Sequence, residues 1–479
     1  MTRPIAVPDA VPPARKLSLI DTGWLLMETP ESPMHVGSLQ LYELPADAGP
    51  DYLANLYEAM VQGDAFCAPF NRKLQKSLGG LEAAWVRDDG MDIEYHVRHS
   101  ALPRPGRVRE LLALVSRLHA HRLDRRRPMW ECHLIEGLEG NRFAVYVKMH
   151  HSLVDGVAGS RLLQSRLSPL PLERPVAPWS AAWEQGREAR RQEARVLPSV
   201  GEELKSLGRS VRQIVAMAKL PLAGNARAIY QAPRTQLNQH ITGARRFAAQ
   251  SWSLARIKAV GAKHGATVND VFLAMCAGCL RDYLISLDAL PAEPLVAQVP
   301  VALRSVDQAD EGGNAITTMQ VSLGTHLAEP LARLTAIRDS VQVAKTRLGN
   351  MTALDIFNLT ALTNLPLTLG QVTGISGRTP RPLFNLVISN VPGPCQPLHL
   401  GNAKLLANYP VSLIWHGYAV NITVQSYCDN LDVGIIACRN TVPRVQRMLD
   451  HLETALAELE QAPATAEPVA DTGIVPILR

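Results

Sequence analysis

Residues 141–167, NRFAVYVKMHHSLVDGVAGSRLLQSRL, decide the fold, because the spacing of their apolar residues changes in the middle of the stretch. Up to His151 the side chains alternate between two faces, as they do in a β-strand. Beyond it the spacing becomes helical, and Leu162, Leu163 and Leu167 form a stripe. A strand that runs directly into a helix predicts an α/β fold, and such junctions are common places for chemistry.

Two adjacent histidines stand at this junction, in the motif MHHSLVDG (residues 149–156), although the chain has only 14 histidines in 479 residues. Strand alternation places His151 on the face that carries Val147, and His150 on the face that carries Lys148. Burial beside an apolar channel keeps an imidazole neutral, and a general base has to be neutral. The alternation therefore predicts His151, rather than His150, as a catalytic base.

Two other interpretations of the motif remain open on the residues alone. A histidine pair at the end of a strand can be purely structural, and histidine with aspartate supplies the ligand types of a metal site. A strand points its two histidines to opposite faces, however, and no further His/Cys cluster lies nearby, so no metal is expected. Asp155 either pairs with an arginine or orients the imidazole, and Gly156 permits a tight turn or a close backbone approach.

The composition is that of an ordinary globular protein, with 47% hydrophobic and 19% charged residues. A chain of 479 residues exceeds what one core usually supports, so two domains are expected. The net charge of +5 is mildly basic, which fits an acidic cosubstrate or an anionic lipid surface. No nucleic-acid partner is expected, because such proteins carry a far stronger basic patch.

The cysteines indicate the compartment. They are scattered, and only Cys276 and Cys279 lie close together, in the apolar run VFLAMCAGCL (residues 271–280). We expect both to be buried residues of a helix rather than a redox pair, and the protein to reside in the reducing cytoplasm. The N-terminus lacks the apolar core of a signal peptide, and no apolar run reaches the ~18 residues of a transmembrane helix, so membrane contact would be peripheral.

The chain is expected to form two mixed α/β domains joined by a helical crossover. Residues 1–14 and 462–479 are predicted to be poorly ordered tails. The N-terminal domain is assigned to residues 15–178, the charged linker to residues 179–240 and the C-terminal domain to residues 241–461. The second half contains one predicted buried helix, residues 268–284, and three predicted strands, within residues 294–303, 382–393 and 431–438.

Apolar residues recur at helical spacing within the linker, with basic residues among them. Two interpretations stay open: a helix packed on the domains, or a basic amphipathic helix that lies on a lipid surface. The apolar positions are Leu204, Leu207, Val211, Ile214, Val215 and Ala218, and the basic ones are Lys205, Arg209, Arg212 and Lys219.

HHxxxDG resembles the signature of the CoA-dependent acyltransferase superfamily, which includes chloramphenicol acetyltransferase, plant BAHD acyltransferases and peptide-synthetase condensation domains. Further blocks narrow the resemblance to the bacterial wax ester synthase/diacylglycerol acyltransferase family, and they occur in order from about residue 16 to residue 460. One departure is Met129, which replaces the leucine of the usual PLW and conserves its volume. The blocks are LSLIDTGWLLMETPESPMHVGSLQLYE (17–43), LDRRRPMWECHLIEGL (123–138), VND (268–270), PVALR (300–304), EGGNAITTMQVSLG (311–324), SNVPGP (389–394) and NITVQSYCDNLDVGI (421–435).

The resemblance implies two chloramphenicol-acetyltransferase-like α/β domains with a channel between them. It also implies transfer of a long-chain fatty acyl group from acyl-CoA to a long-chain alcohol or to diacylglycerol. By the same resemblance His151 is the base and His150 supports it, with no acyl-enzyme. No bound cofactor is implied, since acyl-CoA is a cosubstrate, and the protein is expected at the inner membrane face or at lipid inclusions.

Other roles follow from the resemblance. Asn269 is the candidate for contacting the acyl carbonyl or the oxyanion, although an amide that caps the following helix is an equal alternative. Asp270 is expected to be structural. Asp155 resembles the aspartate that pairs with an arginine in this superfamily, and Arg304 stands where that partner is expected. Such a pair would hold the two domains together.

A second group of residues has weaker assignments. Residues of the SNVPGP block are expected to line the substrate channel, although a tight turn alone would explain them. We interpret residues 125–127, three consecutive arginines, as a solvated charge cluster rather than a CoA-phosphate site. Two alternative functions remain, an acyltransferase with a different acceptor and a non-catalytic lipid-binding homologue. The channel residues are Ser389, Asn390, Pro392 and Gly393.

Overall fold

The computed structural model describes residues 15–63, 65–76, 83–154, 156–181, 232–302, 316–349 and 351–464. Several predictions lie outside these residues. They concern Asp155, Arg304, the amphipathic pattern of residues 204–219, the N-terminal tail and most of the C-terminal tail.

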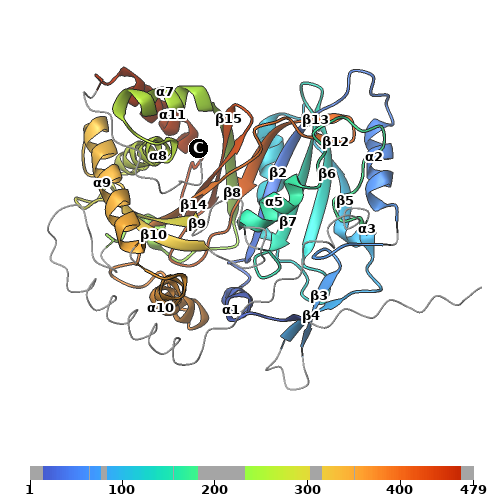
Figure 1. Ribbon diagram of the computed structural model, residues 1–479, viewed down its shortest axis with the longest axis horizontal. Helices are drawn as coiled ribbons and strands as arrows, with labels where there is room; N and C mark the ends of the chain where they lie inside the picture. The colour runs from blue at the N-terminus through green and yellow to red at the C-terminus, as the bar shows by residue number, and fades with distance from the viewer. Residues whose placement is uncertain are drawn as a thin grey trace, which may run out of the picture.

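Two six-stranded sheets organise the molecule and lie side by side (Figure 1). A third, small sheet has the order β1 (Arg15–Lys16), β4 (Ala83–Arg87) and β3 (Arg72–Lys76). The N-terminal sheet has the order β12 (His399–Leu400), β13 (Ala403–Val411), β2 (His35–Glu43), β7 (Arg142–His150), β6 (Trp130–Leu138) and β5 (Val97–Ala101). The C-terminal sheet has the order β10 (Ile316–Ser322), β9 (Val296–Ala302), β11 (Leu386–Val391), β14 (Val420–Tyr427), β15 (Asn430–Cys438) and β8 (Arg245–Ser253).

The expected mixed α/β fold is confirmed, and the strands predicted within residues 294–303, 382–393 and 431–438 correspond to β9, β11 and β15. The remaining elements are helical. They are α1 (Leu19–Met27), α2 (Tyr52–Val61), α3 (Ile93–His96), α4 (Val108–Ala120), α5 (Gly156–Gln164), the short η3 (Gln236–Asn238), α7 (Leu254–His264), α8 (Val268–Ile285), α9 (Pro330–Gly349), α10 (Ala353–Val372) and α11 (Arg447–Gln461).

One segment of the C-terminal half belongs to the N-terminal sheet. Strand β13 pairs antiparallel with β2, from Lys404 opposite Glu43 to Val411 opposite Gly37. Where β13 crosses β15, a Cβ at Gly434 would collide with the carbonyl oxygen of Pro410, so only glycine fits. The two sheets therefore do not divide at one point of the chain, as the expected domains 15–178 and 241–461 do. The assignment of those ranges as separate domains stays a prediction.

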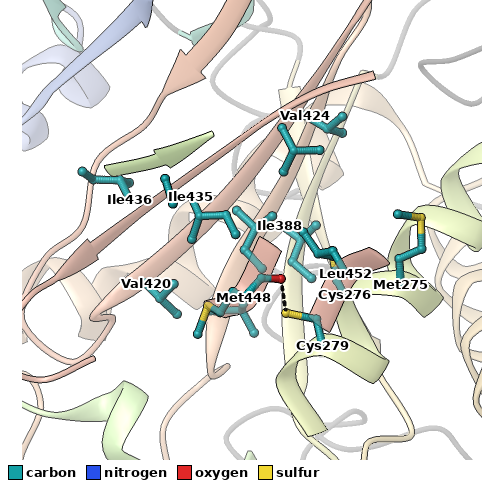
Figure 2. Packing of buried hydrophobic residues seen from close by; sticks show 14 of the residues in the cluster. Met275, Cys276, Cys279, Ile388, Val420, Val424, Ile435, Ile436, Met448 and Leu452 are labelled. Carbon is teal, nitrogen blue, oxygen red and sulfur yellow. Dashed lines mark hydrogen bonds between the residues drawn. The ribbon is translucent and has the colours of Figure 1, made fainter. Parts of the chain in front are cut away.

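Helix α8 is buried on nearly all sides, because it packs against the C-terminal sheet as well as against α9 and α11. Figure 2 shows Ile388 of β11 beside Cys276 of α8 and Leu452 of α11. Burying one such side chain contributes about 1.5–3 kcal/mol, so this cluster is a main source of stability. The predicted buried helix is confirmed, and both Cys276 and Cys279 are buried in it.

Helix α4 lies between the two large sheets. Its Leu111 and Val115 share one apolar core with Tyr146 of β7 and Phe247 of β8. The C-terminal end of α4 is fixed by Lys148 of β7, whose side chain is 1% exposed. Its ammonium donates to the carbonyl oxygens of Leu118 and His121, each at 2.9 Å. Both faces of β7 are therefore buried, one in the apolar cluster of Val147 and the other against α4.

The strand-to-helix change predicted from residues 141–167 is confirmed, with one difference. The strand β7 ends at His150, and His151 is the first residue of the turn that leads to α5. Strand alternation therefore does not set the direction of the His151 side chain. In the described part of the chain, no helix has the length and apolar character that crossing a membrane would require.

Candidate active site

The backbone of the histidine pair is held from two sides. The N–H of His150 donates to the carbonyl oxygen of Met129 at 2.9 Å, and His150 faces His35 across the β2–β7 pair. The N–H of His151 donates to the carbonyl oxygen of Met34 at 2.8 Å. The turn that carries His151 is thus fixed to the segment between α1 and β2.

Hydrogen bonds determine which nitrogen of the His150 ring carries the proton. The backbone N–H of Ser152 donates to Nδ1 of His150 at 3.1 Å, and the Ser152 hydroxyl lies 2.7 Å from the same nitrogen. A ring nitrogen that accepts a hydrogen bond carries no proton, so the proton of neutral His150 sits on Nε2. That nitrogen faces the Glu28 carboxylate at 3.6 Å. Both ring nitrogens therefore face protein groups, and a fully buried His150 is unsuited to accept a proton from a substrate.

Glu28 is the charged group behind His150. It follows α1 directly, and its side chain is only 1% exposed. Burial by itself raises the pKa of this carboxyl, but the neighbouring His150 ring and the Arg125 guanidinium together lower the pKa to about 2. Arg125 donates from Nε at 2.9 Å and lies within 2.7 Å through Nη2. Glu28 is therefore ionised at neutral pH.

Glu28 also reaches the backbone that holds His151. Its Oε1 accepts from the N–H of Met34 at 3.3 Å, and the carbonyl oxygen of the same Met34 accepts from His151. One carboxylate thus positions the ring of His150 and the peptide that orients His151. No local pattern around Glu28 indicates this role, because a glutamate at the end of a helix usually faces solvent.

The ring of His151 is stacked on an aromatic side chain. Trp24 of α1 lies 4.1 Å from it between ring centroids, with 27° between the planes. Trp24 precedes Glu28 by one helical turn, so α1 presents both residues to the histidine pair. His151 itself is half-buried. Trp24 was missed in the sequence, where the four-residue spacing between a tryptophan and a glutamate was its only sign.

The prediction that residues 125–127 form a solvated charge cluster is wrong for Arg125. That side chain pairs with Glu28 and also donates to the carbonyl oxygen of Leu25 at 2.7 Å. Arg126 fits the prediction, since it is 90% exposed and pairs with Asp124. Arg127 lies over the ring of Tyr95, with 4.0 Å from its guanidinium carbon to the ring centroid.

The helix that follows the motif contacts the C-terminal sheet. The hydroxyl of Ser160 in α5 donates to Oε1 of Gln425 in β14 at 3.1 Å, and the Gln164 amide donates to the same hydroxyl. This contact places the junction at the boundary between the two halves of the molecule. Gly156 is the first residue of α5, and no described atom lies within 4 Å of where its Cβ would stand.

The predicted channel residues lie at the end of β11, beside β14. Ser389 pairs with Thr423, whereas Asn390 pairs with Val424 of the apolar core, so the two side chains project to opposite faces. Asn390 is buried on the α8 side, and Pro392 follows the strand directly. Gly393 packs so closely on β14 that a Cβ would collide with the carbonyl oxygen of Ser426.

Asn269 lies in the first turn of α8 and contacts Asn390. The Asn390 amide donates to Oδ1 of Asn269 at 3.5 Å. The interpretation of Asn269 as a helix cap is wrong, because Thr267 and Asp270 form the capping box at this end. The Asp270 carboxylate accepts from the Thr267 N–H at 3.0 Å. Asp270 therefore serves the helix, which leaves the Asn269 amide for another role.

The geometry thus gives two groups of site residues, the histidine pair with α1 and the asparagine pair between α8 and β11. Comparison with known proteins shows the family of the chain. The catalytic-domain profile of wax ester synthase/diacylglycerol acyltransferases matches residues 17–272, and the C-terminal-domain profile of that family matches residues 312–460. The chain belongs to the wax ester synthase/diacylglycerol acyltransferase family. It is an acyltransferase, and the resemblance predicted from the motifs is confirmed.

Relatives of known sequence and structure agree. A probable diacylglycerol O-acyltransferase of Mycobacterium tuberculosis is 46% identical over 453 residues, which cover 92% of this chain and 98% of that protein. The solved wax ester synthase/diacylglycerol acyltransferase of Marinobacter aquaeolei VT8 is 43% identical and covers 93% of this chain, with 98% of its own length matched and a TM-score of 0.76.

A more distant likeness supports the fold alone. The first condensation domain of the CDA synthetase has a TM-score of 0.57 at 16% identity, with 95% of this chain and 98% of that chain covered. The expected likeness to condensation domains is therefore confirmed for the architecture. Within the acyltransferase, Trp24, Glu28 and the histidine pair all fall inside the matched catalytic domain.

Proposed function

We propose that this acyltransferase moves a long-chain fatty acyl group from acyl-CoA to the hydroxyl of a long-chain alcohol or of diacylglycerol, with His151 as general base. The observation that carries the assignment of the base is the environment of His150. Its two ring nitrogens face Ser152 and Glu28, so His151 is the member of the pair suited to meet a substrate. Family membership and the names of the relatives support the substrates.

The reaction needs one base and a ternary complex. His151 takes the proton of the acceptor hydroxyl while the hydroxyl oxygen attacks the thioester carbonyl. The tetrahedral intermediate then collapses and the carbon–sulfur bond breaks. His151 gives the proton that it took from the acceptor hydroxyl to the departing CoA thiolate. No acyl-enzyme forms, because binding both substrates together already supplies the required proximity. Stacking on Trp24 restricts the His151 ring to one plane during both proton transfers.

The asparagine pair fits the electrostatic part of the reaction. Since Oδ1 of Asn269 accepts from Asn390, the NH₂ group of Asn269 points away from this contact and keeps its N–H donors for another partner. We assign that group to the acyl carbonyl and to the oxyanion that develops from it. We keep Asp155 and Arg304 as a structural pair, Asp270 and Gly156 as structural residues, and Ser389, Asn390, Pro392 and Gly393 as channel residues.

The acceptors and the products are water-insoluble, so we infer that the enzyme works at a lipid surface in the cytoplasm, on the inner membrane face or on lipid inclusions. The contact would be peripheral.

A CoA-release assay tests the substrate assignment. Palmitoyl-CoA is offered with hexadecanol, with a diacylglycerol and with a short polar alcohol. We expect clear turnover with at least one lipid acceptor and about ten-fold less with the polar alcohol. Equal or greater turnover with the polar alcohol would indicate an acyltransferase with a different acceptor. Absence of CoA release with every acceptor would indicate a non-catalytic lipid-binding homologue.

A further inference from the structure

Exposed apolar side chains gather on α10 and its neighbour α1. Leu365, Leu369 and Val372 recur at spacings of four and three along α10, so they lie on one helix face. The side chains of Leu369 and Val372 are each 54% exposed. Leu26 of α1 is 62% exposed, and α1 and α10 are in contact and lie near each other in Figure 1. We call the set Leu26, Leu365, Leu369, Val372 and Ile375 the α10 surface.

The sequence of α10 differs from that of an ordinary surface helix. Exposed helix faces of globular proteins normally carry charged residues, yet none stands between Asp355 and Arg378. The carboxylate of Asp355 is buried and closes the capping box of α10 with Thr352. Arg378, just beyond the helix, is exposed. The helix therefore presents an uncharged apolar face that has a cation at its edge.

The inner side of α10 leads to the histidine pair. Leu367 of α10 packs in the same cluster as Trp24 and Met27 of α1, and Trp24 is stacked on His151. The outer side of the same helix carries Leu365 and Leu369 into solvent. A single helix layer thus separates the α10 surface from the residues that surround the proposed base.

We propose that the α10 surface docks on a phospholipid surface, so that fatty chains reach the neighbourhood of His151 without crossing water. This proposal rests on the proposed function, because that function supplies the water-insoluble substrates. Apolar side chains enter the interfacial layer, and Arg378 faces anionic headgroups. An anionic phospholipid fits this surface because its exposed side chains are apolar and Arg378 lies at its edge. The α10 surface also has no carboxylate that would repel anionic lipid.

Other exposed apolar residues in the described part of the chain do not form such a face and provide matched controls. Leu170 is 70% exposed in the segment after α5, and Ile285 is 49% exposed at the end of α8. A glutamate at these positions makes the same chemical change outside α1 and α10.

Flotation with vesicles tests the docking. The full-length protein is mixed with vesicles of phosphatidylcholine that contain phosphatidylglycerol, and the double variant Leu369→Glu/Val372→Glu is compared with Leu170→Glu/Ile285→Glu. We expect the α10 double variant to lose vesicle binding about ten-fold or more, and the control to bind as the wild type does. Wild-type binding by the α10 double variant, or absence of binding by the wild-type protein, would overturn the proposal.

A second measurement separates this proposal from the proposed function. Turnover of the α10 double variant is measured with a water-soluble short-chain acyl-CoA and alcohol, and with diacylglycerol embedded in vesicles. We expect soluble turnover within about two-fold of the wild type and a loss of about ten-fold with the embedded acceptor. If the wild type turns over no lipid acceptor, the proposed function fails. If it does and the variant matches it on vesicles, only the docking proposal fails.

Light scattering in the absence of lipid tests whether a second copy of the chain, rather than lipid, covers the α10 surface. A wild-type dimer that becomes a monomer in Leu369→Glu/Val372→Glu would show that a second copy of the chain covers the α10 surface, and would overturn the lipid assignment. An unchanged oligomeric state, together with lost vesicle binding, supports it.

Discussion

The histidine junction and the start of α8 are held in place by different chemistry. Around His150 the anchors include an ionised group, because the buried Glu28 carboxylate has a pKa of about 2 and pairs with Arg125. Around Asn269 they are neutral, since one amide donates to another at 3.5 Å. A proposed base has to be held in one orientation, whereas a proposed oxyanion donor needs an N–H left over for the substrate. The comparison therefore distinguishes residues that orient the proposed base from residues that bind the substrate.

Among substitutions outside the histidine pair, removal of the Asn269 amide should have the largest effect on kcat. Asn269→Ala is expected to lower kcat by about 10²–10³-fold, the usual loss for one oxyanion donor. Stability should barely change, since Thr267 and Asp270 cap α8. Asp270→Ala is the matched control and should cost about 1 kcal/mol of unfolding free energy while largely preserving kcat. Initial rates of CoA release and urea denaturation measure both, and unchanged kcat in Asn269→Ala would remove it from the site.

Removal of the charge of Glu28 should have a smaller effect on kcat. Glu28→Gln keeps the shape of the side chain but loses its charge, so His150 and the Met34 peptide are held less firmly. We expect kcat to fall by about 10–10²-fold with KM nearly constant. Glu293→Gln, which breaks the exposed pair with Arg381, is the control and should be silent. A rise in KM alone would show that Glu28 contacts substrate rather than positions the histidines.

Loss of the aromatic partner should be milder still. Trp24→Leu removes the ring that stacks on His151, and we expect kcat to decrease about three- to ten-fold because the imidazole gains freedom. Trp24→Phe keeps a smaller ring and should recover most of the rate. If Trp24→Phe is as slow as Trp24→Leu, stacking is not what Trp24 contributes.

Low pH should reduce the stability that the Glu28 carboxylate contributes. The pKa of Glu28 is lowered in the folded protein from 4.5 to about 2, so the stability that its ionised form contributes is present above pH 4.5 and is lost as the pH falls toward 2. The difference in unfolding free energy between wild type and Glu28→Gln should be about 1–3 kcal/mol at pH 7 and smaller at pH 3. Urea unfolding at both pH values measures it, and a difference that grows with acid contradicts the assignment.

Local patterns in the sequence predicted much of the architecture. Alternation and helical spacing located β7 and α5, and the apolar run around Cys276 predicted a buried helix. A Thr-x-x-Asp pattern at Thr267 also indicates a capping box, which argues against the capping role considered for Asn269.

Long-range pairings had no comparable local signal. Glu28 and Arg125 are 97 positions apart, and each alone resembles an ordinary surface charge. Strand β13 joins the N-terminal sheet through its register with β2, which depends on the arrangement of the whole chain rather than on its own residues. The motif order identified the family, whereas the residues that orient the histidines emerged only from the packing of α1.

In the proposed mechanism His151 removes the acceptor proton, whereas His150 is a structural residue. The most direct test is the rate of CoA release by His151→Ala from palmitoyl-CoA and the preferred acceptor, with circular dichroism to verify folding. We predict a loss of at least about 10²-fold with the fold retained. A correctly folded His151→Ala enzyme that keeps full turnover would contradict the account.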